Sequence, residues 1–381
     1  MNAFAVTVGV VQFFFVTTWT AYVIYLPQLV AQAGIDRHWV PWILAADQVI
    51  FAVTDVVTGF WVDRMRAGIA RLGGWILGAT ALSCAAFLAM PFAGASPGLL
   101  LAAIAVWALT SSALRSPPWA LLGRYAAKPS VPWLSTLVLT GTAIASGLAP
   151  YLGIALRGID PKVPFLVSTV TLLVSVGVLV FAEKRISSGE QPKAEEPDSA
   201  RNIGPVFIAL LVLAVGFQIH FSLNSAPRYL KFAPAAELQF LMPVFWVGFN
   251  LMMFPASMAV KRIGAADLLT LAAALGALGT LASAFAPGKD LLVLAQFVAG
   301  GCWGAACVAA YTAAVGFGRG GREGRFLGAL FAVLALATFA RLAISGAGLP
   351  AQPGFSGMLA WAPQACWLLG AMLLLAARLR R

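Results

Sequence analysis

Twelve apolar stretches, each long enough to form a membrane-spanning helix, take up most of this chain of 381 residues. A helix needs roughly 20 mostly apolar residues to cross the hydrocarbon core of a bilayer. The segments between the stretches are short and carry proline, glycine and charge, as loops do. The sequence therefore predicts an all-α membrane protein with twelve transmembrane helices, at residues 4–30, 40–62, 71–93, 97–118, 131–156, 162–183, 204–230, 236–260, 265–286, 290–316, 324–347 and 354–378.

Composition excludes an ordinary soluble protein. Only 10% of the residues are charged and 61% are hydrophobic, whereas soluble domains carry about 25% charged residues. The twelve stretches leave no room for a soluble catalytic domain. The four cysteines lie inside apolar stretches and form no C-x-x-C pair, so we interpret them as packing residues: Cys84, Cys302, Cys307 and Cys366.

The distribution of basic residues predicts the orientation in the membrane. With the N-terminus on the cytoplasmic side, seventeen of the 25 lysines and arginines fall in cytoplasmic segments and six in outer ones, while Arg115 and Arg341 fall within spans. Cytoplasmic loops are enriched in lysine and arginine, so we expect both termini to be cytoplasmic. The net charge of +11 thus indicates orientation, with no nucleic-acid partner. Short loops and termini favour a bacterial inner (plasma) membrane.

One hydrophilic segment divides the chain. Residues 184–203 contain two prolines and the acidic pair Glu195-Glu196, a composition typical of a flexible cytoplasmic linker. We expect an N-terminal six-helix bundle at 1–183 and a C-terminal one at 204–381. Tyr25-Leu26 and Tyr229-Leu230 are a faint echo between the two parts, and repeated halves with a site between them are a common plan of transporters.

The loop after the second span carries a recognisable motif, Gly59-Phe-Trp-Val-Asp63-Arg64, followed by Gly68 and Arg71. It resembles the signature of the major facilitator superfamily, which has glycine, three residues, aspartate, a basic residue, one residue, glycine and further basic residues. Here Gly68 comes two positions late and Arg71 stands for the final basic group. The layout of six spans, linker and six spans extends the resemblance over the whole chain.

The resemblance implies a secondary transporter that works by alternating access, in which Gly59, Asp63 and Arg64 latch the two halves together on the cytoplasmic side. Glycine lets two helices approach closely. Asp63, at the membrane edge, is placed to accept hydrogen bonds from the positive N-terminal end of a neighbouring helix. The alternative is a basic loop that only sets the topology.

Ionisable side chains within spans are costly and are candidates for function. In the superfamily the second span packs against the eleventh, and Asp47 and Arg341 lie at nearly the same depth, so we predict an ion pair between them that closes an outer gate. The alternative is that Asp47 pairs within its own half and Arg341 reaches outward to lipid headgroups. We expect a second pair between Asp55 and Arg115, toward the cytoplasmic end.

These four residues are our candidates for coupling and gating. A carboxyl group takes up a proton more readily when it is desolvated and less readily beside a cation. Gain or loss of an arginine neighbour would therefore make Asp47 or Asp55 release or bind a proton, which is the chemistry that proton coupling needs. A fixed structural pair is the alternative for Asp55.

A substrate cavity is expected between the first and seventh spans, which line the central cavity in the superfamily. The candidate cavity residues are Gln12, Thr18, Tyr22, His220 and Asn224. His220 and Asn224 are four residues apart and would share a helix face. The alternative is that these polar side chains tie helices together.

The sequence thus predicts a carrier of a small-molecule solute that uses protons and works in the lipid bilayer. We expect no enzyme activity, no cofactor and no metal site, because His38 and His220 lie in different halves and form no catalytic cluster. A phosphate-binding loop for ATP is also missing from the sequence. The alternatives are a proton-antiport efflux pump for amphipathic compounds, suggested by Gly147 and Pro150 in the fifth span, and a non-transporting receptor or assembly factor.

Overall fold

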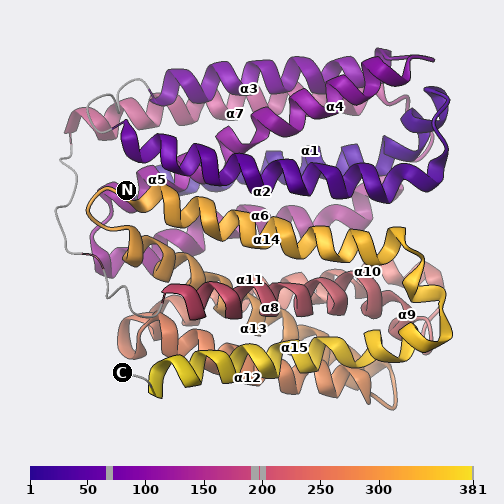
Figure 1. Cartoon of the computed structure of the whole chain (residues 1–381), viewed down its shortest axis with the longest axis vertical. Coiled ribbons are helices and arrows are strands. Elements are labelled where there is room, and N and C mark those ends of the chain that lie inside the picture. Colours follow the sequence, from indigo (N-terminus) through magenta and orange to yellow (C-terminus); the bar gives the residue numbers. More distant parts are fainter. Residues whose placement is uncertain (66–71, 190–196, 198–202, 380–381) are drawn as a thin grey trace.

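The computed structural model describes residues 1–65, 72–189, 197 and 203–379 (Figure 1). In these residues every regular element is a helix, and twelve helical stretches are long and apolar enough to cross a membrane. The prediction of an all-α, multi-pass membrane protein with twelve spans is confirmed. Most of the predicted linker lies outside the described residues, as do Gly68 and Arg71 of the loop motif.

The first half of the chain forms the first six spans. Its helices are α1 (Asn2–Gln32), η1 (Arg37–Trp39), α2 (Val40–Arg64), α3 (Leu72–Ala89), η3 (Met90–Phe92), α4 (Pro97–Ser111), η4 (Ser112–Leu114), α5 (Ser116–Tyr125), η5 (Lys128–Ser130), α6 (Val131–Ala155) and α7 (Lys162–Gly189).

The second half of the chain forms the other six spans. Its helices are α8 (Ile203–Gln218), η7 (Ile219–Asn224), α9 (Ser225–Tyr229), η8 (Ala235–Glu237), α10 (Leu238–Leu241), α11 (Pro243–Ile263), α12 (Ala265–Ala284), α13 (Lys289–Gly318), α14 (Glu323–Gly346), η9 (Leu349–Ala351) and α15 (Pro353–Leu379). In Figure 1 the helices of the first half lie in the upper part and those of the second half in the lower part.

The fourth span differs most from its prediction, because it reaches Tyr125 and is broken in the middle. The α-helix α4 ends at Ser111, a 3₁₀ turn follows, and Arg115 has backbone angles outside the helical region. Pro117 and Pro118 cause the break, since a proline lacks the N–H that an uninterrupted helix needs and is tolerated in a first turn. The break places Arg115 at the start of α5.

The seventh span contains a π-helical segment, η7, between α8 and α9. A π-segment inserts extra backbone into a helical turn and is frequent at functional sites. Here it changes the faces on which the following side chains lie. Ser225 uses its hydroxyl group to donate to the carbonyl oxygen of His220, five residues earlier.

The two halves meet along two long helix pairs, α2 with α14 and α6 with α11. In Figure 1 the dark purple ribbon of α2 runs above the orange ribbon of α14. Glycines make the first contact close: an added Cβ at Gly59 would collide with the carbonyl oxygen of Gly324, and one at Gly328 with that of Asp55. Small residues allow this approach where helices pack within a membrane.

Large apolar side chains remain exposed on the outside of the helices, for example Val53, Val57, Val174 and Leu278. Such a surface suits lipid and would be unfavourable in water. Cys84, Cys302 and Cys307 are buried as free thiols, and Cys366 is half-buried. The interpretation of the cysteines as packing residues agrees with these positions.

Candidate functional site

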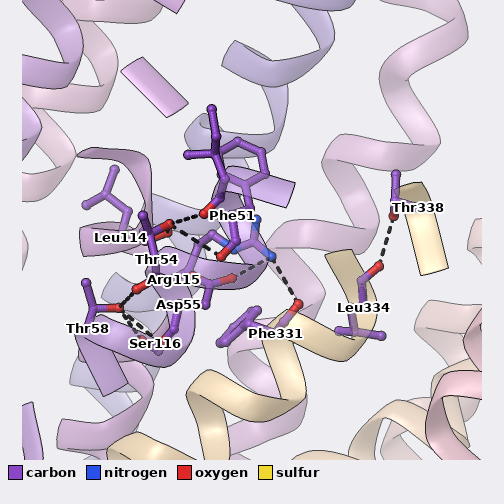
Figure 2. Close-up of polar contacts among 12 residues, drawn as sticks. Phe51, Thr54, Asp55, Thr58, Leu114, Arg115, Ser116, Phe331, Leu334 and Thr338 are labelled. Carbon is purple, nitrogen blue, oxygen red and sulfur yellow. Dashed lines mark hydrogen bonds and ion pairs between the residues drawn. The ribbon is translucent and has the colours of Figure 1, made fainter. Parts of the chain in front are cut away.

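Arg115 joins the two halves of the chain and contacts α14 about two turns after that helix begins. Its Nη2 lies 3.1 Å from Oδ2 of Asp55, which is fully buried in α2, and 3.5 Å from the carbonyl oxygen of Phe331 in α14. Figure 2 shows this bridge, with Asp55 on one side of the guanidinium group and Phe331 on the other. The predicted Asp55–Arg115 pair is confirmed, and it also reaches the other half.

Two aromatic rings enclose the same guanidinium group. Its central carbon lies 4.9 Å from the ring centre of Phe51 and 5.3 Å from that of Phe331. A cation over an aromatic face is attracted by the ring quadrupole, most strongly where water is absent. Arg115 therefore has one anionic partner, one carbonyl partner and two aromatic partners, contributed by both halves.

Hydroxyl groups attach α2 to the break in the fourth span. Thr54 forms a hydrogen bond with Ser112, and Thr58 forms one with Ser116 at 3.1 Å. Both threonines also donate to carbonyl oxygens of their own helix. These contacts fix α2 against the turn that carries Arg115, so the position of Asp55 relative to Arg115 is set from both sides.

The loop motif lies one to two turns further along the same interface. Asp63 accepts hydrogen bonds from the backbone N–H groups of Gly324 at 2.8 Å and Arg325 at 3.0 Å, and its Oδ2 lies 3.2 Å from Nε of Arg325. The predicted contact of Asp63 with the N-terminal end of a neighbouring helix is confirmed, and that helix is α14. Arg64 is exposed and takes no part in these bonds.

A third charged contact closes this end of the interface. Arg124, at the end of α5, lies 3.8 Å from Glu323, at the start of α14, and both side chains are buried. Asp63 and Arg124 thus hold the first turn of α14, and Arg115 contacts the same helix about two turns further along, at Phe331. The halves are in contact at the end of the molecule where we predict the cytoplasm.

The predicted Asp47–Arg341 pair is not formed. Asp47 is buried in the first half, where its Oδ2 accepts a hydrogen bond of 2.8 Å from the hydroxyl group of Tyr22. Arg341 is in none of the ion pairs formed among the described residues, and its Nε is buried without a hydrogen-bond partner. Eight residues separate Asp47 from Asp55, which rotates the two carboxyl groups about 80° apart on α2, so only Asp55 faces the second half.

The candidate cavity residues of α1 bind partners in their own half. Gln12 donates through Nε2 to the carbonyl oxygen of Leu114 at 2.6 Å, Thr18 donates to the carbonyl oxygen of Phe14 at 2.8 Å, and Tyr22 binds Asp47. All three side chains are buried. These hydrogen bonds connect groups within the first half, and a role of the three residues in binding substrate stays a prediction.

The candidate cavity residues of the seventh span also bind within their own half. His220 shares a hydrogen bond of 3.1 Å between its Nε2 and Oε1 of Gln296 in α13. Asn224 donates to the carbonyl oxygen of Leu359 in α15 at 2.8 Å. Both residues lie within the π-segment, and they contact different helices, His220 α13 and Asn224 α15. The structure therefore does not bring the two groups of candidate residues together.

A second polar group lies between the seventh and eleventh spans, and the sequence alone predicts no role for it. Gln218 donates through Nε2 to the hydroxyl group of Thr338 in α14 at 3.0 Å, and exposed Ser222 donates to Oε1 of Gln218 at 3.4 Å. Ser222 follows His220 by two residues and so projects on the opposite side of the segment. Polar residues at positions 218 and 222 of an apolar span are the only signal of this group in the sequence.

A buried network around Gln296 is likewise absent from the sequence predictions. Its Nε2 donates to the hydroxyl groups of Ser225 and Ser283, and Arg228 donates to Ser283 at 3.2 Å and to the carbonyl oxygen of Ala360 at 3.0 Å. The sequence predicts Arg228 only as an orienting charge at the outer end of its span. Its bonds within the second half require the fold and cannot be read from the local sequence.

Comparison with known proteins identifies the fold. The family model of the Major Facilitator Superfamily matches residues 8–340. No curated protein matches the sequence. Similar solved structures include the human organic anion transporter MFSD10 (TETRAN), with a TM-score of 0.77 and 14% identity over 98% of this chain and 99% of that one.

Two further structures have the same arrangement of helices. A bacterial homologue of the iron transporter ferroportin, in an outward-facing state, has a TM-score of 0.72 and 16% identity over 98% of this chain and 99% of its own. The fucose:proton symporter FucP of E. coli has a TM-score of 0.67 and 15% identity over 100% and 98%. Identities this low show the fold alone. Members of the superfamily are transporters that carry small-molecule solutes, and by the family model, which matches most of its length, this chain belongs to the Major Facilitator Superfamily.

Proposed function

We propose that the protein is a secondary active transporter that moves a small solute across the membrane by alternating access and couples this movement to protons. The observation that carries the proposal is the position of Arg115, which is bound to Asp55 of its own half and to the Phe331 carbonyl of the other half. A charge pair at that place links the protonation of one carboxyl group to the contact between the halves.

Protonation of Asp55 would leave Arg115 without its anionic partner. A buried cation without its counter-charge is strongly unfavourable. Arg115 would regain favourable interactions if water reached it, and water reaches this depth from the cytoplasmic side only when the halves separate there. A proton on Asp55 therefore favours the inward-open state, and loss of the proton favours the state in which the halves are in contact at that end.

Asp63 supports the same cycle as a latch. Its carboxylate accepts two backbone hydrogen bonds from the first turn of α14, where the positive end of the helix dipole stabilises an anion. These bonds hold the cytoplasmic side closed and must break when it opens. We propose that Gly59 belongs to the latch because it allows the two backbones to meet, and that Arg64 contributes to the positive cytoplasmic surface.

For the solute we propose a site bordered by the polar group of Gln218, Ser222 and Thr338. Arg341 follows Thr338 by three residues on α14 and is the cation nearest to that group along the helix. The candidate cavity residues Gln12, Thr18, Tyr22, His220 and Asn224 would support this site from behind by fixing the helices. Asp47 would take part in coupling only if its bond to Tyr22 opens.

The membrane and orientation follow from charge. Seventeen basic residues fall on one side and six on the other, so we propose a cell inner (plasma) membrane location with both termini in the cytoplasm.

The efflux-pump alternative rests on the glycine and proline residues of the fifth span. In α6 an added Cβ at Gly141 would collide with Gly9, and Gly147 lies against Trp246, so close packing accounts for these glycines.

Proton flux into liposomes tests the proposal. The purified protein is reconstituted with an internal pH dye, pooled candidate solutes are added, and Asp55→Asn is compared with the wild type and with Asp290→Asn, which changes an exposed carboxyl group. We expect solute-dependent proton movement in the wild type and in Asp290→Asn, and its loss in Asp55→Asn. Solute uptake with no proton movement in any of the three would overturn the coupling.

A further inference from the structure

A long apolar groove runs along the bilayer-facing side of the second half. It has a volume of about 530 Å³ and lies between α11, α12 and α13. Helices α11 and α12 each pack on α13, which forms the floor of the groove. Leu271, Leu278 and Leu294 stand exposed along its edges, so the groove opens toward lipid and not toward the interface between the halves.

Small residues line the groove on both α11 and α12 and leave space between these helices. Ala256 and Ala259 line it on α11, and Ala272 and Gly279 line it on α12. Along α12 the lining extends from Leu268 to Ala282, which is about 21 Å of helix. One leaflet of the hydrocarbon core is about 15 Å deep, so the groove is long enough to hold an extended acyl chain from the first carbon to the leaflet centre.

The end of the groove near Ala259 and Leu268 carries two cations. Lys261 and Arg262 are exposed on the last turn of α11, and neither is in the ion pairs formed among the described residues. The nearest acidic residue along the chain, Asp267, is already paired with Arg378 at 3.2 Å. Arg262 follows Ala259 by three residues and so lies on the face of α11 that lines the groove, with Lys261 next to it in the chain, which leaves positive charge at this end of the groove.

We propose that this groove is a binding site for an anionic phospholipid of the cytoplasmic leaflet. The phosphate would lie against Lys261 and Arg262, and one acyl chain would fill the space beside Ala259 and Ala272. Anionic headgroups are attracted to basic clusters at the cytoplasmic ends of transmembrane helices, and burial of an acyl chain adds affinity for each methylene group. The assignment to the cytoplasmic leaflet rests on the proposed orientation; the site itself does not depend on transport.

Native mass spectrometry of the detergent-purified full chain measures the binding. Dioleoyl phosphatidylglycerol is compared with dioleoyl phosphatidylcholine, which has the same chains and no net charge, and with glycerol 3-phosphate, which has the phosphate and no chains. We expect the first to bind most tightly. The double variant Lys261→Gln/Arg262→Gln should bind it about 30-fold more weakly, the loss expected for two basic residues at a membrane surface.

Two variants distinguish binding in the groove from attraction to surface charge alone. Ala259→Trp places a large ring in the groove and should weaken binding of both phospholipids while the two cations remain. Arg157→Gln/Lys231→Gln removes the same charge from exposed positions on the other side of the molecule and should leave binding unchanged. Equal binding of the two phospholipids, tight binding of glycerol 3-phosphate alone, or an Ala259→Trp variant that binds like the wild type would overturn the proposal.

Discussion

Arg115 shows how one residue obtains partners in both halves of a membrane protein. The prolines that follow it break the fourth span, and the break turns the guanidinium group toward α2 and α14. The position of Arg115 therefore depends on Pro117 and Pro118 as much as on the charge of Asp55.

Replacement of Asp55 tests whether the opposite charges of the buried Asp55–Arg115 pair stabilise the protein by neutralising each other. Asp55→Asn leaves Arg115 without a counter-charge and should lower the free energy of unfolding by about 3–5 kcal/mol. The double variant Asp55→Asn/Arg115→Gln removes both charges and should recover most of that loss, without recovering proton coupling. Thermal unfolding in detergent measures both variants. A double variant as unstable as the single one would mean that the charges are not what stabilises this contact.

Gln296 is a second residue whose partners lie far apart in the sequence. Gln296→Leu leaves the ring of His220 and the hydroxyl groups of Ser225 and Ser283 without their amide partner. We expect a loss of about 1–3 kcal/mol in unfolding free energy, measured by thermal unfolding. Gln239→Leu, at a position with a local bond to Ala236, is the matched control. Equal effects of the two variants would count against a cooperative network.

At the scale of elements, we propose that the contact between α2 and α14 decides whether the predicted cytoplasmic side is closed. The backbones of the two helices meet at Gly59, Gly324 and Gly328, and Asp63 binds the first turn of α14 at the same end of the contact. The local motif predicted the role of glycine and the hydrogen bonds of Asp63, because both follow from residue type and position at a helix end. The sequence could not predict that Arg124 and Glu323 add a third contact.

Gly59→Ala tests this close packing. The new methyl group would overlap the carbonyl oxygen of Gly324, so the two helices must separate at this level. We expect transport to fall at least tenfold, with a cysteine at Thr58 becoming reactive toward cytoplasmic maleimide. Gly74→Ala, on α3 where an added Cβ meets open space, should behave like the wild type. Unchanged reactivity in Gly59→Ala would contradict closure through this contact.

Some elements could be predicted and others not, for physical reasons. Span positions follow from runs of apolar residues, since each span must satisfy its own backbone in lipid. The Asp55–Arg115 pair follows because buried charges require partners. The Tyr22 bond of Asp47 and the π-segment after Gln218 leave no such pattern. The bond between Tyr22 and Asp47 depends on which face of α2 meets α1. The π-segment depends on a shift of backbone hydrogen bonds, which does not require any particular residue type.

For the whole molecule, the proposed orientation rests on charge alone and can be tested directly. Single cysteines at Lys128 and Arg262 should react with a membrane-impermeant maleimide only from the cytoplasmic side, and cysteines at Arg157 and Lys231 only from the outside. The basic residues predict this arrangement through the positive-inside rule. Labelling of intact cells and of inverted vesicles measures it. The opposite pattern would place the latch on the outer side and reverse the direction of coupling.

The central claim is that protonation of Asp55 drives the halves apart on one side and together on the other. Distances between paired spin labels measure this directly, at Lys128 and Arg262 for the cytoplasmic side and at Arg157 and Lys231 for the outer side. The labels are placed in a variant whose four native cysteines are replaced by alanine. We predict that Asp55→Asn, which mimics the protonated residue, lengthens the first distance and shortens the second. Unchanged distances, or a lengthening of both, would contradict alternating access controlled by this pair.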